Sequence, residues 1–515
     1  MLLDTELYSS ILNPLGLAGL FILLPTLIFL LASLKASRLP LINGKKPFEL
    51  RQIHAGRRFL KDARSLIEEG LSKASAFRLM TENGPKTVLS ANYADEIRSH
   101  PSLNFGAAIA KEFHADIPGF DTFKQGTRVD EIFQDAVRMK LTHHLDLMGE
   151  FLIWLGNVIE PISDEIGIVL ERDWTNNRDW HDIALKQNVL KLVAQMSSRV
   201  FLGKRICRNP DWIRITIAYT IDSYIAALAL RLWPATVRSL VSNFIPSCRK
   251  LRQEIEEART IIQPVLDERR MAKEEAIRAG KMPERYVDAM EWLEESAKGR
   301  YYDPVIAQLS FSHASIHTTS DLITQTLLDL CGRDELIQEL RDEIVTVMET
   351  EGRKKSTLFK LKLMDSVLKE TQRLKPIAVA TMRRLAEEDT VLSDKTFLPK
   401  GELIVVACDK MWDPNIYPNP TTYDPYRFLK LRETPGHETS AQLVSPSPEH
   451  LGFGFGKHAC PGRFFAANEV KIALCHILLK YDIKLAEGYE PRILPNGLSL
   501  NSDHMARISI RRREE

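Results

Sequence analysis

The sequence predicts a mainly α-helical fold with small β-sheets, preceded by one N-terminal transmembrane helix. Apolar residues recur at three- and four-residue spacing from Asp182 to Leu202 and from Trp212 to Leu232, which is typical of packed amphipathic helices. Short alternating segments between residues 377 and 406 predict a small sheet. An uncharged stretch near the N-terminus has the length of a membrane span. The 515 residues suit a single large domain or two ordinary ones.

The uncharged stretch runs from Leu15 to Leu34, about the length that crosses a bilayer core. A cleaved signal peptide is the alternative. Against it, Asp4 and Glu6 stand where such a peptide carries lysines, and the apolar run exceeds the usual h-region. Basic residues follow the span at once, so the positive-inside rule places the rest of the chain in the cytosol. These residues are Lys35, Arg38, Lys45 and Lys46.

We therefore expect three parts. They are a membrane anchor over residues 1–36, a hinge with proline and glycine over residues 37–50, and one domain over residues 51–515. The net charge of +1 gives no indication of nucleic acid, and the six cysteines lack metal-site or disulfide spacing. The cysteine usage favours a reducing compartment, so the endoplasmic reticulum membrane of a eukaryote is the expected location.

Residues 105–125 show no sustained period, although they are rich in glycine, phenylalanine, isoleucine and histidine. This pattern predicts a long loop, and long loops in compact domains often form lids or binding surfaces. Phe113, Ile117 and Phe120 are therefore candidate pocket residues. The alternative for each of them is plain packing.

A helix predicted from Asp303 to Gly332 carries an unusual polar cluster. Asp303 is a suitable N-cap, Pro304 suits the first turn, and Gly332 suits the exit. At 1.5 Å per residue the helix spans ~40 Å, enough to cross the domain. Small and polar residues at 314–319 interrupt its apolar face, and polar groups in a buried helix need partners or a purpose.

Two other helices and a strand are predicted around this one. The segment from Ser247 to Ala279 is heavily charged and is expected to be a solvated helix interrupted at Pro264. The segment from Thr357 to Lys375 is expected to be a helix that ends before a proline. The strand from Ile377 to Arg384 follows, and it supplies Ile377 and Val379 as candidate pocket residues.

A glycine-rich loop from Phe453 to Gly462 contains the most informative cysteine. Three glycines and one proline in ten residues exclude a regular helix or strand. Cys460 stands just ahead of an apolar helix, where backbone N–H groups and the helix dipole favour a thiolate. A thiolate in such a loop, with room for a flat group against the backbone, meets the requirements of an axial haem ligand. A buried free cysteine is the alternative, but it leaves the glycines and aromatics unexplained.

A haem carries two propionates, so nearby cations become candidates for holding it. Arg383 or Arg384, at the end of the predicted strand, is one candidate partner. Four more cations lie on the helix after the long loop, where ordinary surface charge is the alternative. They are Arg138, Lys140, His143 and His144.

Four separated motifs, in the right order, resemble those of the cytochrome P450 family. Residues 453–462 match every fixed position of the haem signature F-G-x-G-x-[RH]-x-C-x-G. Residues 314–319 resemble [AG]-G-x-[DE]-T-[TS], except that Ser315 replaces the glycine and His317 replaces the acid. Residues 370–373 resemble E-x-x-R, and residues 424–428 resemble the P-E-R-F segment, with a tyrosine in place of its acid.

The resemblance implies a cytochrome P450 fold and a role for each matching residue. Thr318 is expected to hydrogen-bond dioxygen, with back-bonding to its own helix as the alternative, and His317 either relays protons or bonds elsewhere. Glu370, Arg373 and Arg427 are expected to form a buried triad behind the haem loop. The remaining assignments concern the haem and the substrate. Haem contacts are expected from Cys460, His458, Phe453, Gly454 and Gly462, and pocket contacts from Ala314, Leu498 and Leu500.

The implied function is monooxygenation of a lipophilic molecule by haem b, with dioxygen as co-substrate. Electrons would come from NADPH through a separate NADPH-cytochrome P450 reductase, with cytochrome b5 as a further partner, because the chain has no flavin or nicotinamide fingerprint. Other short segments of the sequence are similar to fungal family members of secondary metabolism, which oxidise diterpenoids, indole diterpenes and meroterpenoids. The expected substrate is thus a terpenoid or meroterpenoid.

Two other functions remain open from the sequence. A reductase-independent isomerase or dehydratase would keep the fold and act on pre-oxidised substrates, and His317 in the acid position lends it some support. A non-catalytic haem sensor would need a distal face without the polar cluster that residues 315–318 provide.

Overall fold

The computed structural model describes residues 39–47, 49, 53–125, 132–138, 152–352 and 355–514. For residues 152–158 and 355–356, only the backbone is described. The expected anchor lies outside the described residues, as do Lys140, His143 and His144. Part of the expected hinge is described, and its Leu41–Ile42 forms the first strand of the main sheet.

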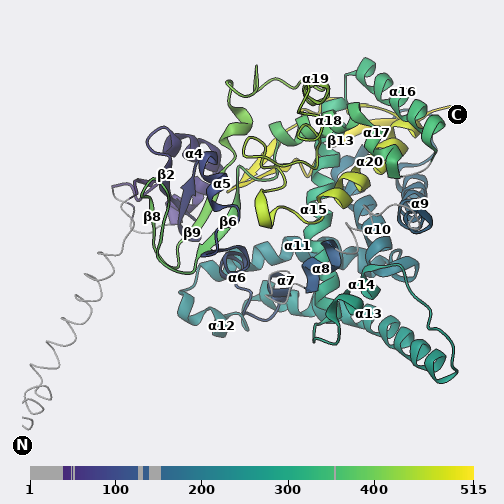
Figure 1. The fold of residues 1–515 in the computed structure, drawn as a ribbon, viewed down its shortest axis with the longest axis horizontal. Helices are drawn as coiled ribbons and strands as arrows, with labels where there is room; N and C mark the ends of the chain where they lie inside the picture. Colours follow the sequence, from purple (N-terminus) through teal and green to yellow (C-terminus); the bar gives the residue numbers. More distant parts are fainter. Residues whose placement is uncertain are drawn as a thin grey trace, which may run out of the picture.

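Long helices form most of the molecule and pack around helix α15, while the main sheet lies to one side (Figure 1). The predicted fold class, mainly helical with small sheets, is confirmed. The longer helices are α9 (Leu152–Val169), α10 (Leu185–Ile206), α11 (Pro210–Arg231), α13 (Pro246–Arg278), α15 (Pro304–Leu330), α16 (Asp334–Glu351), α18 (Lys362–Leu374) and α20 (Arg463–Lys480). The shorter helices are α3 (Ile53–Lys61), α4 (Ala63–Leu71), α5 (Ala94–Ile97), α6 (Phe105–Glu112), α7 (Asp121–Gln125), α8 (Ile132–Asp135), α12 (Arg238–Val241), α14 (Ala289–Ala297), α17 (Lys355–Lys360) and α19 (Arg427–Glu433).

The main sheet has six strands in the order β1-β2-β3-β9-β6-β4. Its strands are β1 (Leu41–Ile42), β2 (Ala76–Thr81), β3 (Gly84–Leu89), β4 (Leu103–Asn104), β6 (Ala380–Ala386) and β9 (Leu403–Ala407). Three smaller sheets are formed by β5 (His181–Ala184) with β10 (Tyr481–Leu485) and β13 (Arg507–Arg512), by β7 (Thr390–Val391) with β8 (Phe397–Leu398), and by β11 (Ile493–Asn496) with β12 (Ser499–Ser502).

Helix α15 begins and ends as the sequence predicts. The Asp303 side chain accepts hydrogen bonds from the backbone N–H groups of Val305 at 2.9 Å and Ile306 at 3.1 Å. Gly332, just past the helix, has φ +82°, a left-handed conformation that glycine adopts without strain. Helices α7, α10, α11 and α20 all contact α15, so its side chains reach the centre of the molecule.

Three local expectations are wrong. Residues 105–112 form helix α6 instead of a loop, because the Asn104 side chain caps it and its alanines favour helix. Helix α13 continues through Pro264 without a break. The helix expected over residues 357–375 is divided at Leu361 into α17 and α18.

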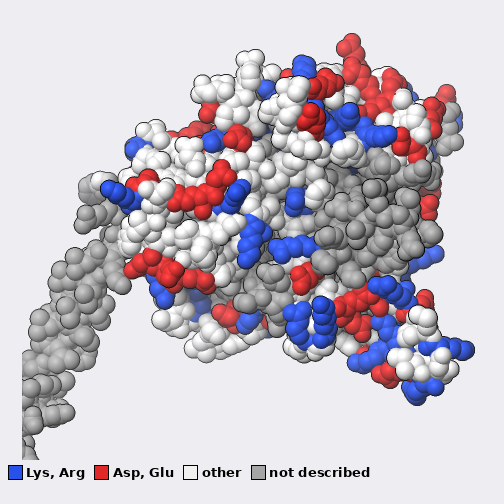
Figure 2. Space-filling model, viewed as in Figure 1, with Lys and Arg blue, Asp and Glu red and all other residues white. Residues whose placement is uncertain are grey.

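Two helices, α13 and α11, test the expectations about a solvated surface and a membrane span. The outer end of α13 projects from the body and presents both signs of charge, as expected for a solvated helix (Figure 2). Among the described residues, α11 is the one helix long and apolar enough to cross a membrane, but 44 % of its most apolar window is buried in the body.

Candidate functional site

Backbone hydrogen bonds close the Cys460 loop on itself. The Cys460 N–H donates to the Phe453 carbonyl at 2.8 Å, and the Gly454 N–H donates to the Leu451 carbonyl at 2.9 Å. Gly454 and Gly456 have φ of +69° and +75°. A Cβ on Gly456 would lie 2.3 Å from Cβ of Arg98, so this position also requires glycine for space.

The loop has open space at Gly462, two residues after the cysteine. A Cβ added to Gly462 would meet no atom within 4 Å, and Cys460 is itself only partly buried. Burial raises the pKa of the Cys460 thiol, while the Gly462 backbone N–H and the Arg463 charge lower it. The groups at the helix start thus lower the pKa of Cys460 as expected. In the protein alone, burial raises this pKa by more than they lower it. A metal cation at the sulfur would supply the missing stabilisation, so the loop fits haem iron.

Arg384 is a buried cation that lacks a counter-ion. It is 1 % exposed, its Nε has no hydrogen-bond partner, and no carboxylate of the described residues forms an ion pair with it. Burial lowers the pKa of Arg384 to about 10. His458 lies near it, and burial followed by the charges of Arg384, Lys457 and Arg138 lowers the pKa of His458 to about 4. Basic groups gathered in this way fit the two carboxylates of a haem.

Arg383 reaches a different partner. Its Nε lies 3.2 Å from Oε2 of Glu112, a carboxylate that also binds Lys86. A β-bulge in β6 explains why these two adjacent arginines have different partners. One extra residue lies between Thr381 and Arg384 in the pairing of β6 with β9, and Met382 has φ +51°. Bulges re-aim the side chains that follow them, and this one leaves Arg384 as the better candidate for a propionate.

The polar cluster of α15 faces open space at two positions. Ala314 and Thr318 are exposed, although most of the helix around them is buried. The Thr318 hydroxyl donates to the carbonyl of Ala314 at 3.0 Å and lies 3.2 Å from that of Ser315. The hydroxyl hydrogen is therefore used in a hydrogen bond within the helix, which is the back-bonding alternative given by the sequence. The oxygen lone pairs remain available to accept a hydrogen bond from a neighbour.

His317 points away from this space. Its Nε2–H donates to the carbonyl of Ile217 in α11 at 3.0 Å, and burial lowers the pKa of the ring. Of the two roles left open by the sequence, bonding elsewhere is the one that the geometry favours. His317 thus links α15 to α11.

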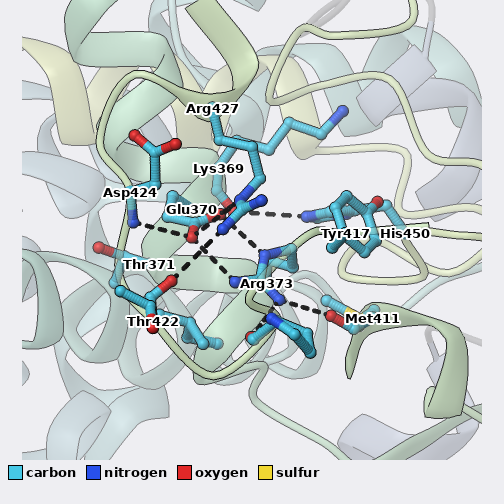
Figure 3. Close-up of polar contacts among 12 residues, drawn as sticks. Lys369, Glu370, Thr371, Arg373, Met411, Tyr417, Thr422, Asp424, Arg427 and His450 are labelled. Atoms are coloured by element: carbon cyan, nitrogen blue, oxygen red, sulfur yellow. Dashed lines mark hydrogen bonds and ion pairs between the residues drawn. The ribbon is translucent and has the colours of Figure 1, made fainter. Parts of the chain in front are cut away.

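Glu370, Arg373 and Arg427 lie together in the interior (Figure 3). Glu370 and Arg373 are both 0 % exposed and form two hydrogen bonds of 2.8 Å. Arg427 places its Nε 3.1 and 3.2 Å from the two Glu370 oxygens. Carbonyl oxygens of Met411 and Pro420 accept from Arg373, so each charge has a partner.

Lys369 is a residue whose importance the sequence analysis missed. Its ammonium donates to three backbone carbonyls just upstream of the cysteine loop, and burial lowers its pKa to about 7. The acceptors are Ser440 at 2.9 Å, Gln442 at 2.7 Å and Ser445 at 3.2 Å. Its position directly beside Glu370 was the available signal, but lysines at helical positions are usually solvated.

The predicted pocket residues fall into two groups. Phe113, Ile117 and Phe120 are buried in the large helical core. The strand and the C-terminal turn meet elsewhere, where Val379 N–H donates to Leu498 O at 2.8 Å and Leu500 N–H to Ile377 O at 3.2 Å. Val379, Leu498 and Leu500 are buried in a smaller core beside the sheet.

Glu469, in the helix that follows Cys460, is a second residue that the sequence analysis missed. It is 0 % exposed, and Ser197 Oγ donates to its Oε1 at 2.8 Å. Burial raises the pKa of Glu469 to about 8. The folded protein therefore keeps a proton that the unfolded chain releases above its ordinary value of 4.5.

Because of this raised pKa, Glu469 contributes stability that is complete below pH ~4.5 and is lost as the pH rises to about 8. We expect Glu469→Gln to stay within about 1 kcal/mol of the wild type at pH 5 and to exceed it by roughly 4 to 5 kcal/mol at pH 8.5. Denaturant unfolding at both pH values measures the difference, with the exposed Glu490→Gln as control. A difference that does not change with pH would contradict the prediction.

Comparisons with known proteins agree with this geometry. The family model described as Cytochrome P450 matches residues 99–505. The chain is 57 % identical over 509 residues to cytochrome P450 monooxygenase adrA of Penicillium rubens, covering 98 % of this chain and 97 % of the relative. It is 49 % identical over 471 residues to cytochrome P450 monooxygenase trt6 of Aspergillus terreus, covering 91 % and 93 %.

A solved structure shares the fold at lower identity. Retinoic acid bound cyanobacterial CYP120A1 has a TM-score of 0.65 and 17 % identity, covering 92 % of this chain and all of that one. The family match and the identity across nearly the whole length settle the classification, and the monooxygenase relatives settle the enzyme class. This chain belongs to the cytochrome P450 family and is a monooxygenase.

Proposed function

We propose that this protein is a membrane-bound haem-thiolate monooxygenase that oxidises a lipophilic secondary metabolite of the terpenoid or meroterpenoid type. The observation that carries the proposal is the loop-held Cys460, only partly buried, with open space at Gly462 two residues later. The fungal relatives, named as monooxygenases, support oxidation of a metabolite. Electrons are proposed to come from NADPH through a separate reductase, with cytochrome b5 as a further donor.

The proposed haem contacts follow from the site. Cys460 would hold the iron through its sulfur, and Arg384 and His458 would hold the propionates. Gly454 keeps the loop in its left-handed turn, Gly462 leaves room for the ring, and Phe453 lies beside them in the same loop. When bound, haem supplies activation of dioxygen and oxidation of an unactivated C–H bond.

Thr318 is proposed to position a proton donor. Because its hydrogen is engaged with the Ala314 carbonyl, its oxygen accepts a hydrogen bond from a water molecule in the adjoining space. Ala314 leaves room for that water or for substrate. Since the Nε2–H of His317 is already bound to Ile217, the support that this histidine lent to a reductase-independent isomerase is weakened.

We expect Thr318→Ala to lower product formation by about 10²-fold, the scale of a lost acid–base contribution. NADPH consumption should fall much less, so product per NADPH drops. Thr318→Ser, which keeps the hydroxyl, should restore most of the product yield. Haem content measured in parallel separates this effect from misfolding, and a Thr318→Ala enzyme with wild-type yield per NADPH would refute the assignment.

The proposed location is the endoplasmic reticulum membrane, with the catalytic body in the cytosol and residues 1–36 as a single-pass anchor. The connection between α11 and α13 supports a further membrane contact. It exposes four large apolar side chains, which cost free energy in water and suit a lipid surface. They are Leu232 at 77 %, Trp233 at 47 %, Leu240 at 66 % and Phe244 at 70 %.

The proposed function is tested with membranes that carry the full chain and a fungal P450 reductase. A panel of terpenoids and meroterpenoids is incubated with and without NADPH, and products are analysed by mass. We expect a gain of one oxygen atom in at least one compound, only with both NADPH and reductase. Conversion without them would favour the isomerase or dehydratase function instead.

A further inference from the structure

We propose that Lys369 is a positioning residue that holds the backbone of Cys460 in place, through the chain segment 440–445 and the side chain of Arg463. This inference rests on the proposed function, in which Cys460 is the iron ligand, and concerns how the fold fixes that ligand. Segment 440–445 lies upstream of the cysteine loop, and Lys369 lies on helix α18.

Lys369 is a buried cation whose donors all go to one segment. It is 2 % exposed, and its ammonium donates to the carbonyls of Ser440, Gln442 and Ser445, as described above. Three acceptors require three N–H donors, which the ammonium form supplies. Burying a charge costs free energy, and the three carbonyl dipoles offset that cost only while the segment keeps this conformation. The buried charge therefore favours one conformation of segment 440–445.

Asp365, one helical turn before Lys369, binds the same segment through an N–H group. Its Oδ2 accepts from the backbone N–H of Leu443 at 2.9 Å, and its Oδ1 lies 2.6 Å from Nζ of Lys471 in α20. The Leu443 side chain is 1 % exposed and belongs to the large core. One face of α18 thus binds an N–H group and three carbonyls of a single short segment.

Arg463 links this segment to the cysteine. Its Nε donates to the Val444 carbonyl at 3.0 Å, and its Nη1 donates to the Cys460 carbonyl at 3.0 Å. Because a guanidinium group is planar and rigid, it holds these two carbonyls at a fixed separation. Val444 lies between Leu443 and Ser445, which both bind α18. The carbonyl of Cys460 is therefore tied to α18 through the segment.

The backbone of Cys460 is held at both of its polar groups. Its N–H donates to the Phe453 carbonyl within the loop, and its carbonyl accepts from Arg463. The sulfur follows the backbone, because only the Cα–Cβ and Cβ–S bonds lie between them. Loss of the support from Lys369 should therefore displace the thiolate before the body of the protein unfolds.

The experiment uses Lys369→Met in the haem-loaded full chain, with Lys86→Met as the matched control. Lys86 is also 2 % exposed, but its ammonium binds Glu112 and not the segment. Hydrogen exchange is followed by mass spectrometry, and the thiolate band by the carbon monoxide spectrum of the reduced protein. Burial lowers the pKa of Lys369 to about 7, so both are measured at about pH 6.5, where the ammonium predominates.

In Lys369→Met we expect the amides of residues 440–460 to exchange about tenfold faster than in the wild type, the worth of one lost hydrogen bond. On mild warming the thiolate band should disappear about tenfold faster, while circular dichroism still reports a folded protein. In Lys86→Met, band and circular dichroism should be lost together. Arg463→Lys keeps the charge, but its single nitrogen cannot span both carbonyls. It should loosen Cys460 and leave segment 440–445 protected.

Wild-type exchange of residues 440–460 in Lys369→Met, or faster exchange spread evenly over the molecule, would overturn the proposal. So would a thiolate band that disappears only together with the fold in both Lys369→Met and Arg463→Lys. If Lys369→Met yields no folded protein, Lys369→Gln, which keeps a shorter neutral donor, gives the same comparison. A wild type without the thiolate band would contradict the proposed function, whereas hydrogen exchange would still test the link from Lys369 to Cys460.

Discussion

Glu370→Ala is expected to lower the free energy of unfolding by about 3–5 kcal/mol, the scale of breaking a buried ion pair. The substitution removes the one carboxylate between Arg373 and Arg427 and leaves two guanidinium groups facing each other. Arg373 is 0 % exposed, so water cannot replace the lost partner. Denaturant unfolding and the yield of folded, haem-loaded protein measure the loss.

Glu339→Gln is the control for this prediction. Glu339 also accepts a hydrogen bond, from the Tyr426 hydroxyl at 2.7 Å, but it lies on an exposed surface. Its replacement should change the free energy of unfolding by less than about 0.5 kcal/mol. If Glu370→Ala cost no more than this surface change, the triad would not hold the region behind the cysteine loop.

Cys460→Ser is expected to abolish the thiolate-ligated carbon monoxide spectrum of the reduced protein and to leave no measurable oxygenated product. A serine hydroxyl is a far weaker ligand for iron, because it does not ionise at neutral pH. The loop should still fold, since it is closed by the backbone bonds of Cys460 and Gly454. Circular dichroism should therefore remain that of the wild type.

Cys475→Ser provides the comparison, in the helix that follows the cysteine loop, α20. Burial raises the pKa of the Cys475 thiol to about 12, so it stays a neutral, inert group. This variant should keep both spectrum and product. A Cys460→Ser protein that retained the thiolate spectrum would transfer the ligand role to another residue and remove the basis of the proposed function.

The sequence predicted those parts of the site that depend on local chemistry. The glycine-rich loop, the capped helix α15 and the spacing of Glu370 and Arg373 are written in short segments, and each is found in the structure. The Arg427 contact, 57 residues from Glu370, was accessible only through the family resemblance.

What the sequence could not predict depends on tertiary placement. Arg383 and Arg384 are adjacent and alike, and only the extra residue in β6 assigns them to different partners. Lys369 and the carbonyls of residues 440–445 lie far apart in the chain, so no local pattern joins them. Helix α6 was missed because its Asn104 cap was overlooked among the glycine and phenylalanine that suggested a loop.

The bulge at Met382 restricts which substitutions this enzyme can accept during evolution. Through it, two neighbouring arginines of one strand meet different partners: Arg383 pairs with Glu112, and Arg384 lies near His458 of the cysteine loop. A one-residue deletion there would remove the bulge and change the partners of both arginines at once. Substitutions that adapt the enzyme to new ligands must therefore preserve the bulge, because the positions of both arginines depend on it.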